Sequence, residues 1–207
     1  MAGSSTHTVG DKTVGVLALQ GGVREHIQSL ERCGVHAVPV KSTEQLSLID
    51  GLVIPGGEST TIIKLATRYN LVEPIRAMAR NAVPLMGSCA GMILLADHIK
   101  GGIEGQETVG GIDMVVQRNA FGRQTESFEA PVALEGDPEP FPGVFIRAPL
   151  VISQGPAVQV ISTIEQGPHA GRIVGIQQGN LMATAFHPEL TPDSRVHQMF
   201  VDLVQQN

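Results

Sequence analysis

The stretch "GSCAG" places Cys89 between Gly87 and Gly91, where one apolar run ends and another begins. A residue in this Gly-x-nucleophile-x-Gly pattern, between a strand and a helix, is typical of a nucleophile elbow, because small neighbours permit a tight, strained turn. Backbone N–H groups at the start of a helix also stabilise a thiolate. We therefore predict that Cys89 is an exposed nucleophile. The alternative is a close-packed turn that buries a small residue.

A nucleophilic thiol needs a base, and His187 is the histidine whose surroundings suit that role. It follows the apolar run "LMATAF", and Glu189 stands two residues later. Because residues two apart share one face of extended backbone, the Glu189 carboxylate can orient the imidazole toward the sulfur. The sequence therefore predicts a triad of Cys89, His187 and Glu189. A solvated strand end is the simpler alternative for "HPEL".

The other histidines have less suitable positions. One precedes the expected fold, three lie in stretches that we expect to be helical, and two stand beside Gly or Pro without a carboxylate in strand register; these are His7, then His26, His98 and His197, then His36 and His169. A zinc site on the His-x-Glu pair would need a second His or Cys pair at suitable spacing. No such pair is present in the sequence, so no metal is expected.

The "PGGEST" stretch can supply the oxyanion donors that acyl transfer requires. The candidates are backbone N–H groups of this loop, including that of Gly57, and the amide of Ala90 after the nucleophile. Glu58 in the same loop can bind a cationic part of a substrate, or can be an acidic residue that stabilises a helix N-terminus. Neither glycine turn matches a dinucleotide-binding or P-loop motif, so nucleotide binding has little support.

Three strand-turn-helix units bring these loops together. Apolar strands are expected at 13–19, 50–55 and 82–86, each followed by a glycine turn and a stretch of helical periodicity. Strands that alternate with helices pair in parallel, and right-handed crossovers place helices on both faces of the sheet. We therefore predict an α/β fold with a doubly wound, mostly parallel sheet. Its glycine turns should meet at the carboxyl edge, where such sheets bind ligands.

The second half of the chain changes to short strand candidates joined by Gly/Pro turns, which predicts additional antiparallel strands. These candidates are 111–117, 127–134, 143–149, 158–163, 172–177 and 181–186. A closing helix is expected, with Thr191 as its cap, Pro192 at its first position and an apolar stripe of Val196, Met199, Phe200, Leu203 and Val204. Residues 97–111 match no motif and are expected to form a mobile loop.

The composition predicts one ordinary globular domain. The 207 residues are 42% apolar and 16% charged, with a formal net charge of -6. The acidic balance and the absence of an apolar run of about 20 residues argue against nucleic-acid and membrane partners. Two cysteines cannot form a disulfide framework, and Cys33, which recurs with apolar residues at helical spacing, is expected in the core. Because neither a signal peptide nor a membrane segment is recognised in the sequence, the chain should be cytoplasmic. Residues 1–12 are interpreted as a disordered leader or an expression remnant, which leaves a single domain at 13–207.

In this order, "GVLALQGGVREH", "LVIPGGESTT", "GSCAGMILLA" and "AFHPEL" resemble the class I glutamine amidotransferase family, and among its members the glutaminase subunits of pyridoxal 5'-phosphate synthase. "RNAFGRQ" and "FIRAP" are similar to those subunits only. The resemblance extends from about Val14 to Val204, with Ser88 where many relatives have Thr. It implies a flavodoxin-like class I glutaminase fold and hydrolysis of L-glutamine to glutamate and ammonia through a glutamyl thioester on Cys89.

The resemblance also implies roles that spacing alone does not assign. Glutamine contacts are implied for Gly57, Glu58, Ser59, Arg118, Ile146 and Arg147, and Gln20 is implied to organise the oxyanion loop. An Arg suits a substrate carboxylate because its planar fork can bind both oxygens. Ammonia is implied to pass to a separate synthase subunit in a hetero-oligomer that makes pyridoxal 5'-phosphate, and no cofactor is implied for the glutaminase itself.

Two other interpretations stay open. A thiol hydrolase or peptidase on the same scaffold would explain the elbow and the triad, but not the Gly-Gly-Glu-Ser loop or the two arginines. A non-enzymatic scaffolding subunit would not need the three triad residues together. We also expect a glutaminase of this kind to be nearly silent alone, because a glycine-rich oxyanion loop is an easy element for a partner to switch.

Overall fold

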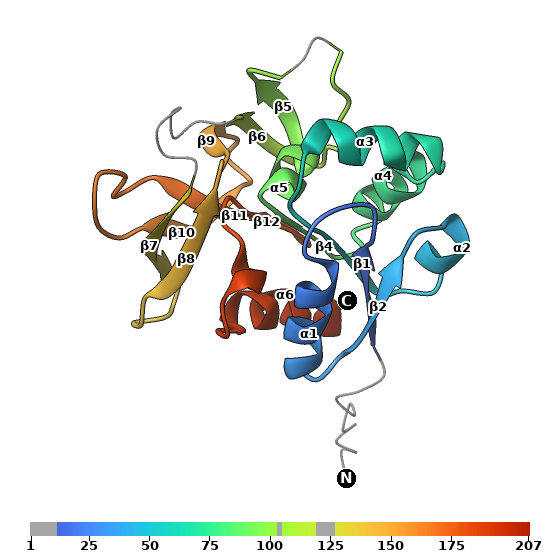
Figure 1. The fold of residues 1–207 in the computed structure, drawn as a ribbon, viewed down its shortest axis with the longest axis horizontal. Coiled ribbons are helices and arrows are strands. Elements are labelled where there is room, and N and C mark those ends of the chain that lie inside the picture. Colours follow the sequence, from blue (N-terminus) through green and yellow to red (C-terminus); the bar gives the residue numbers. More distant parts are fainter. Residues whose placement is uncertain (1–11, 103–104, 119–126) are drawn as a thin grey trace.

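The computed structural model describes residues 12–102, 105–118 and 127–207. A long sheet of nine strands crosses the molecule, and helices cover both faces of its first half (Figure 1). The predicted leader at residues 1–12 lies outside the described residues, apart from its last residue. Within the described ranges, no helix is long and apolar enough to cross a membrane.

Five parallel strands form the first half of the sheet, in the order β2-β1-β3-β4-β12. Their bounds are β1 Thr13–Leu17, β2 His36–Val40, β3 Gly51–Ile54, β4 Leu85–Ser88 and β12 Leu181–Thr184. This is the flavodoxin-like order, in which the first strand lies inside the sheet and the chain winds outward in both directions. The doubly wound parallel sheet is therefore confirmed.

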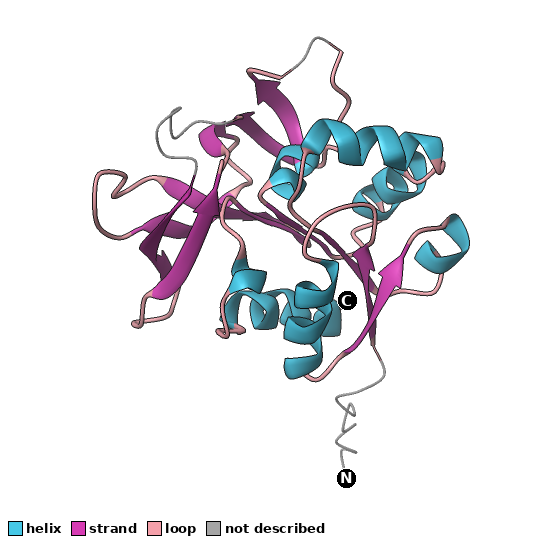
Figure 2. Cartoon of the chain, viewed as in Figure 1, coloured by secondary structure: helices cyan, strands magenta, loops and turns pink. Residues whose placement is uncertain are grey.

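Helices pack on both faces of this parallel half (Figure 2). The helices α1 (Val23–Arg32) and α6 (Arg195–Gln206) cover one face, whereas α3 (Ser59–Arg68), α4 (Val72–Arg80) and α5 (Ala90–Leu95) cover the other (Figure 1). A short helix, α2 (Thr43–Leu46), follows the edge strand β2. At the end of α1, Gly34 has a φ of +83°, the left-handed conformation in which a terminal glycine ends a helix.

The second half of the chain extends the sheet with antiparallel strands, as predicted. These strands follow β12 in the order β11 (Ile173–Gln178), β10 (Gln159–Ile164), β7 (Ser127–Leu134) and β8 (Phe141–Ile146). A separate sheet of three strands contains β5 (Ala96–Lys100), β6 (Ile112–Gln117) and β9 (Leu150–Gln154). The sheet thus combines a parallel half, which carries the glycine turns, with an antiparallel half that continues it beyond β12.

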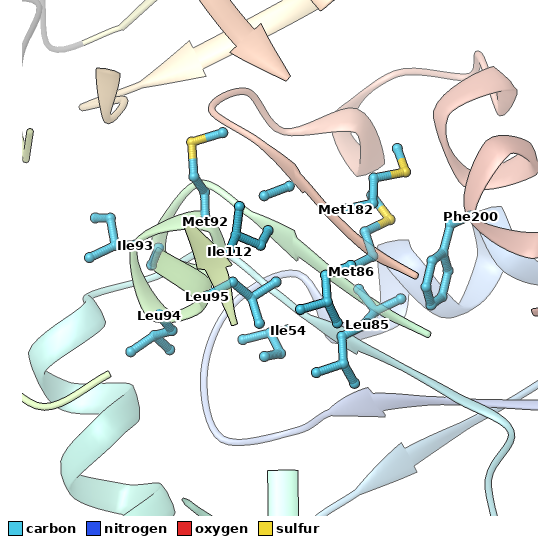
Figure 3. Close-up of a cluster of buried hydrophobic side chains, with 14 of the residues drawn as sticks. Ile54, Leu85, Met86, Met92, Ile93, Leu94, Leu95, Ile112, Met182 and Phe200 are labelled. Carbon is cyan, nitrogen blue, oxygen red and sulfur yellow. The ribbon is translucent and has the colours of Figure 1, made fainter. Parts of the chain in front are cut away.

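The core lies between the parallel strands and their helices. Every residue of β3, β4 and β12 is buried, which explains why their sequences are continuous apolar runs rather than alternating ones. On the face that α5 covers, Ile54 of β3 and Met92 of α5 are fully buried (Figure 3). On the opposite face, Phe200 of α6 is fully buried and approaches Gly51, where a Cβ would lie 3.3 Å from its ring.

Two predicted element boundaries are wrong. The closing helix begins at Arg195 rather than Pro192, because Pro188–Leu190 form a 3₁₀ turn and Thr191 is extended. The apolar stripe of that helix is correct. The helix expected around His98 ends at Leu95, and His98 belongs to β5, where it pairs with Val115.

The expected loop at 97–111 is also partly wrong, since its first residues are in this strand. A short apolar run shows no periodicity that separates a helix from a strand, and the pairing with β6 decides the outcome.

Candidate active site

Cys89 lies in the turn between β4 and α5 and has a φ of +51°. A residue with a side chain is strained in such a conformation, by about 1–3 kcal/mol. The turn can close because Gly87 and Gly91, two positions before and after Cys89, have no side chains. A Cβ on Gly87 would lie 2.4 Å from the carbonyl carbon of Gly91, and one on Gly91 would lie 2.1 Å from the carbonyl oxygen of Ile54. The spacing noticed in the sequence thus corresponds to an elbow with room only for glycine at positions 87 and 91, but Cys89 is only 6% exposed, so the prediction of an exposed residue is wrong.

His187 comes close to Cys89 because β12 lies beside β4. The two strands pair Thr184 with Ser88, and the backbone N–H of Cys89 donates a 2.8 Å hydrogen bond to the Thr184 carbonyl. Nδ1 of His187 lies 2.8 Å from Oε1 of Glu189. This contact fixes the ring and leaves its Nε2, which has no hydrogen-bond partner among the described residues, available for chemistry.

The loop after β3 closes around the same pair of side chains. A Cβ on Gly56 would lie 2.5 Å from Cε1 of His187 and 3.4 Å from Cβ of Cys89. The carbonyl oxygen of Ile146 lies 3.6 Å from Sγ of Cys89 on another side. The thiol and the imidazole are therefore enclosed by backbone from the ends of two strands, β3 and β8.

The charges of the pair are set by burial and by neighbours. Burial favours a neutral His187, but the adjacent Cys89 and Glu189 side chains outweigh it and raise the pKa of His187 to about 10. Burial also opposes the charge of Glu189, yet His26 and His187 together keep the pKa of Glu189 below its usual value. His187 is therefore held as an imidazolium between a carboxylate and the sulfur of Cys89.

A cavity of about 240 Å³ opens beside the thiol. It is lined by Gln20, Gly57, Glu58, Ser59, Cys89, Ala90, Ile93, Arg118, Ile146, Arg147 and His187. All site residues predicted from the sequence line this cavity, except Glu189, which lies behind His187 and is only 6% exposed. The structure thus brings the predicted nucleophile, base, loop donors and arginines together around one space.

Charged side chains are paired within this cavity. Nη2 of Arg118 donates a 2.7 Å hydrogen bond to Oε1 of Glu58, and its Nη1 donates to Oε1 of Gln106 at 3.1 Å. Nε2 of Gln106 in turn donates to Oγ of Ser59 at 3.1 Å. The second arginine, Arg147, is exposed and has a φ of +44°, directly after Ile146. The site therefore offers both a cationic and an anionic group to a ligand.

The loops after β1 and β3 contact each other without room for side chains. Oε1 of Gln20 accepts a 2.6 Å hydrogen bond from the backbone N–H of Glu58. A Cβ on Gly57, which has a φ of +143°, would lie 2.6 Å from that same oxygen. A Cβ on Gly21 would lie 2.0 Å from the carbonyl oxygen of Gly56. Gln20 thus holds the backbone of the loop that carries the candidate oxyanion donors.

Sequence reasoning missed two residues near this site. His26 is completely buried, and its Nε2 lies 3.3 Å from Oε2 of Glu189. A histidine on the apolar face of a predicted helix was a possible signal for such a contact. Gln106 lies in the segment expected to be a loop, and no pattern indicated its contact with Arg118. Among the described residues, no group of three or more His, Cys, Asp or Glu side chains could hold a metal ion.

The model of the SNO glutamine amidotransferase family matches residues 16–206 of the chain. This chain belongs to the SNO glutamine amidotransferase family. Two similar relatives are named pyridoxal 5'-phosphate synthase subunit PdxT. The relative from Nocardioides sp. is 55% identical over 94% of this chain and 96% of its own length, and the one from Streptomyces coelicolor is 56% identical over 94% of each chain.

Solved structures agree with the family. A crystal structure of a glutamine amidotransferase matches this SNO glutamine amidotransferase with a TM-score of 0.85 and 44% identity, over 93% of this chain and 98% of the other. The structure of PurLQS from Thermotoga maritima, at 17% identity and a TM-score of 0.60 over 94% of this chain and 95% of the other, shares the fold. The predicted family and fold class are confirmed.

Proposed function

We propose that this chain is a glutaminase that hydrolyses the side-chain amide of L-glutamine and delivers the ammonia to a pyridoxal 5'-phosphate synthase subunit. The main support is that the elbow thiol, the imidazole and a pair of opposite charges all belong to one cavity of about 240 Å³. The membership of the SNO glutamine amidotransferase family and the names of the similar relatives support the substrate and the pathway.

In the proposed reaction, Sγ of Cys89 attacks the side-chain carbonyl carbon of glutamine. The negative charge on the carbonyl oxygen is stabilised by the N–H groups of Gly57 and Ala90. His187 then donates its proton to the leaving nitrogen, so that the C–N bond breaks and ammonia departs from a glutamyl thioester. Water, deprotonated by His187, attacks the thioester and releases glutamate, which restores the thiol. Glu189 holds the imidazole in the required orientation throughout.

The charged groups of the cavity complement the zwitterionic end of glutamine. Arg118 and Arg147 are proposed to bind its α-carboxylate, and Glu58 its α-ammonium group. Ser59 and Ile146 complete the contacts to the substrate. Because Arg118 and Glu58 are paired with each other in the free site, glutamine binding exchanges one ion pair for two. A ligand with a neutral end would break the Arg118–Glu58 ion pair without forming new ion pairs in its place.

The proposed product must reach its consumer before it is protonated. Near neutral pH most ammonia in bulk water becomes ammonium, which is not a nucleophile. A hetero-oligomer with the synthase subunit, in the cytoplasm, would shorten this path. Gln20 and the glycine loop beside it are proposed as the element that such a partner sets in its active arrangement.

The test is glutamate release from L-glutamine by the purified chain, alone and with the synthase subunit of the same organism. We expect strong stimulation by the synthase, and complete loss in Cys89→Ala. The control Cys33→Ala should keep full activity, because Cys33 lies against α6, where its Sγ is 3.7 Å from the Ser194 carbonyl oxygen. Absence of glutamate release in both conditions, or full activity in Cys89→Ala, would refute the proposal.

A further inference from the structure

Two buried histidines lie directly behind the triad. His26 of α1 and His197 of α6 are both completely buried, and their rings are 5.2 Å apart between centroids. Nδ1 of His26 lies 2.9 Å from Nε2 of His197. A buried polar pair of this kind costs stability unless its hydrogen bonds are made, so its presence in an otherwise apolar layer needs a reason.

The Nε2 side of the His26 ring faces the carboxylate of Glu189. Its Nε2 lies 3.2 Å from Oγ of Ser88 and 3.3 Å from Oε2 of Glu189. Oε2 accepts no hydrogen bond among the described residues, so the contact with His26 is one of distance and charge, whereas Oε1 of the same carboxylate lies within hydrogen-bond distance of His187. His26 is therefore the polar group that lies beside the second carboxylate oxygen of Glu189.

The contacts select one tautomer of His26. With the proton on Nε2, His26 donates toward the carboxylate and the Ser88 oxygen, and its Nδ1 accepts from Nε2–H of His197. With the proton on Nδ1 instead, two lone pairs would face each other at 3.3 Å. His197 would then also carry its proton on Nδ1, a buried atom with no partner among the residues described. Both consequences are unfavourable, so the Nε2–H form is preferred.

Burial keeps both rings neutral. Burial lowers the pKa of His26 and outweighs Glu189 at the site and Glu25 on its own helix, which both raise it, whereas the neighbouring His187 lowers it further. Burial, with His26 and Arg32 nearby, lowers the pKa of His197 to about 3, although Glu189 opposes this. His26 can therefore face the carboxylate as a neutral N–H donor.

We propose that His26 is a positioning residue for the glutaminase reaction: its Nε2–H stabilises Oε2 of Glu189, so that Oε1 stays directed at His187, and His197 fixes the tautomer of His26. This inference depends on the proposed function for its catalytic meaning. The resulting chain of contacts runs from Cys89 through His187, Glu189 and His26 to His197. Its last two members belong to α1 and α6, which cover the face of the sheet opposite to α5 (Figure 1).

The tautomer can be measured without any activity. In the full chain labelled with ¹⁵N in the imidazole rings, we expect NMR spectra near pH 7 to show His26 and His197 neutral, with protons on Nε2. Assignment uses His26→Gln and His197→Gln. A charged His26, or a proton on its Nδ1, would overturn the inference.

The role in catalysis is tested in the complex with the synthase. His26→Leu removes the donor and should lower kcat/KM about 10-fold to 100-fold, the effect of losing a hydrogen bond to a charged group. Without the donor the pKa of Glu189 should rise, which moves the acid limb of the pH profile upward by about one unit. His26→Gln keeps an N–H donor and should restore most activity and the original limb.

A merely structural defect would lower the active fraction equally at every pH, with no rescue by Gln. His98→Leu, at an exposed histidine of β5, is the matched control and should match the wild type. Wild-type kcat/KM in His26→Leu would refute the role of His26. An inactive wild-type complex would instead refute the proposed function, and the NMR result would still decide the tautomer.

Discussion

Arg118 and Glu58, which are 60 residues apart in the sequence, form a 2.7 Å ion pair in the lining of the Cys89 cavity. The Arg118 side chain is only 15% exposed, and Gln106 holds its other nitrogen, so the guanidinium is already oriented before a ligand arrives. A pre-oriented group loses little conformational freedom on binding, which favours affinity for a ligand that fits it.

Replacing this guanidinium should weaken glutamine binding more than it slows the chemistry. Arg118→Lys keeps the charge but cannot bind a carboxylate through two nitrogens. We expect KM for glutamine to rise about 10-fold with kcat nearly unchanged, in steady-state assays of the complex. Arg68→Lys, at an exposed position of α3, is the control. An unchanged KM in Arg118→Lys would contradict the proposed contact with the substrate carboxylate.

Adding one methyl group at Gly56 should misplace the base. The new Cβ would lie 2.5 Å from Cε1 of His187, so the ring must move away from the thiol. A shift of about 1 Å in a catalytic group costs on the order of 100-fold in rate. We therefore expect Gly56→Ala to lower kcat/KM by that factor with little change in the free energy of unfolding.

The control for this variant is Gly51→Ala at the other end of β3, where a Cβ would lie 2.7 Å from Cγ2 of Val204. It should reduce the free energy of unfolding and leave kcat/KM per folded molecule unchanged. If Gly56→Ala instead lowered the free energy of unfolding and left kcat/KM unchanged, the crowding at Gly56 would not act through His187.

The strained φ of Cys89 predicts that glycine at this position makes the folded protein more stable, although it removes the thiol that activity requires. Cys89→Gly and Cys89→Ala both remove the thiol, but only Gly relieves the φ of +51°. The relief is about 1–3 kcal/mol, less 0.5–1 kcal/mol for the greater freedom of Gly in the unfolded chain. Urea unfolding should show Cys89→Gly to be about 1 kcal/mol more stable than Cys89→Ala. Equal stability of the two would mean that the elbow stores no strain.

The buried histidines predict how stability depends on pH. The pKa values of His26 and His197 are lowered in the folded state, so below pH 6.5 the unfolded chain binds protons that the folded chain does not. Stability should fall with decreasing pH by about 1.4 kcal/mol per pH unit for each ring. The pKa of His187 is raised to about 10, so its contribution is lost as the pH rises from 6.5 toward that value.

The free energy of unfolding should therefore be greatest near pH 6.5, as measured by urea titrations at several pH values. His197→Gln removes one of the two rings and should reduce the acid slope by about 1.4 kcal/mol per unit. A slope unchanged by that substitution would show that His197 is not neutral in the folded protein.

Much of the fold could be predicted because the strongest local signals coincide with the parallel half. The strands β1, β3 and β4 are short apolar runs that end in glycine turns, and each is followed by helical periodicity. The local sequence pattern failed to predict secondary structure where contacts between distant segments determine it. The run after Cys89 continues as helix or turns into strand with equal local preference, and only the pairing of β5 with β6 settles it.

The site could be predicted to the extent that its residues lie at strand ends. Cys89, His187 and the "PGGEST" loop all follow strands whose carboxyl ends share one edge, so their meeting follows from the topology. Arg118 and Arg147 were found only through the resemblance. The contact of His26 with Glu189 joins a helix to a 3₁₀ turn, and no sequence period encodes such a distance. The catalytic roles of these residues stay predictions until the variants are measured.

The pairing of β12 with β4 also has a consequence for how the protein is made. The thiol is synthesised about 100 residues before the histidine that serves it, and the strand that carries the histidine is the last one of the sheet in chain order. At typical rates of about 5–20 residues per second, a nascent chain contains Cys89 without its base for roughly 5–20 s. The incomplete chain has no triad, so ammonia release can begin only after the C-terminal strand has docked.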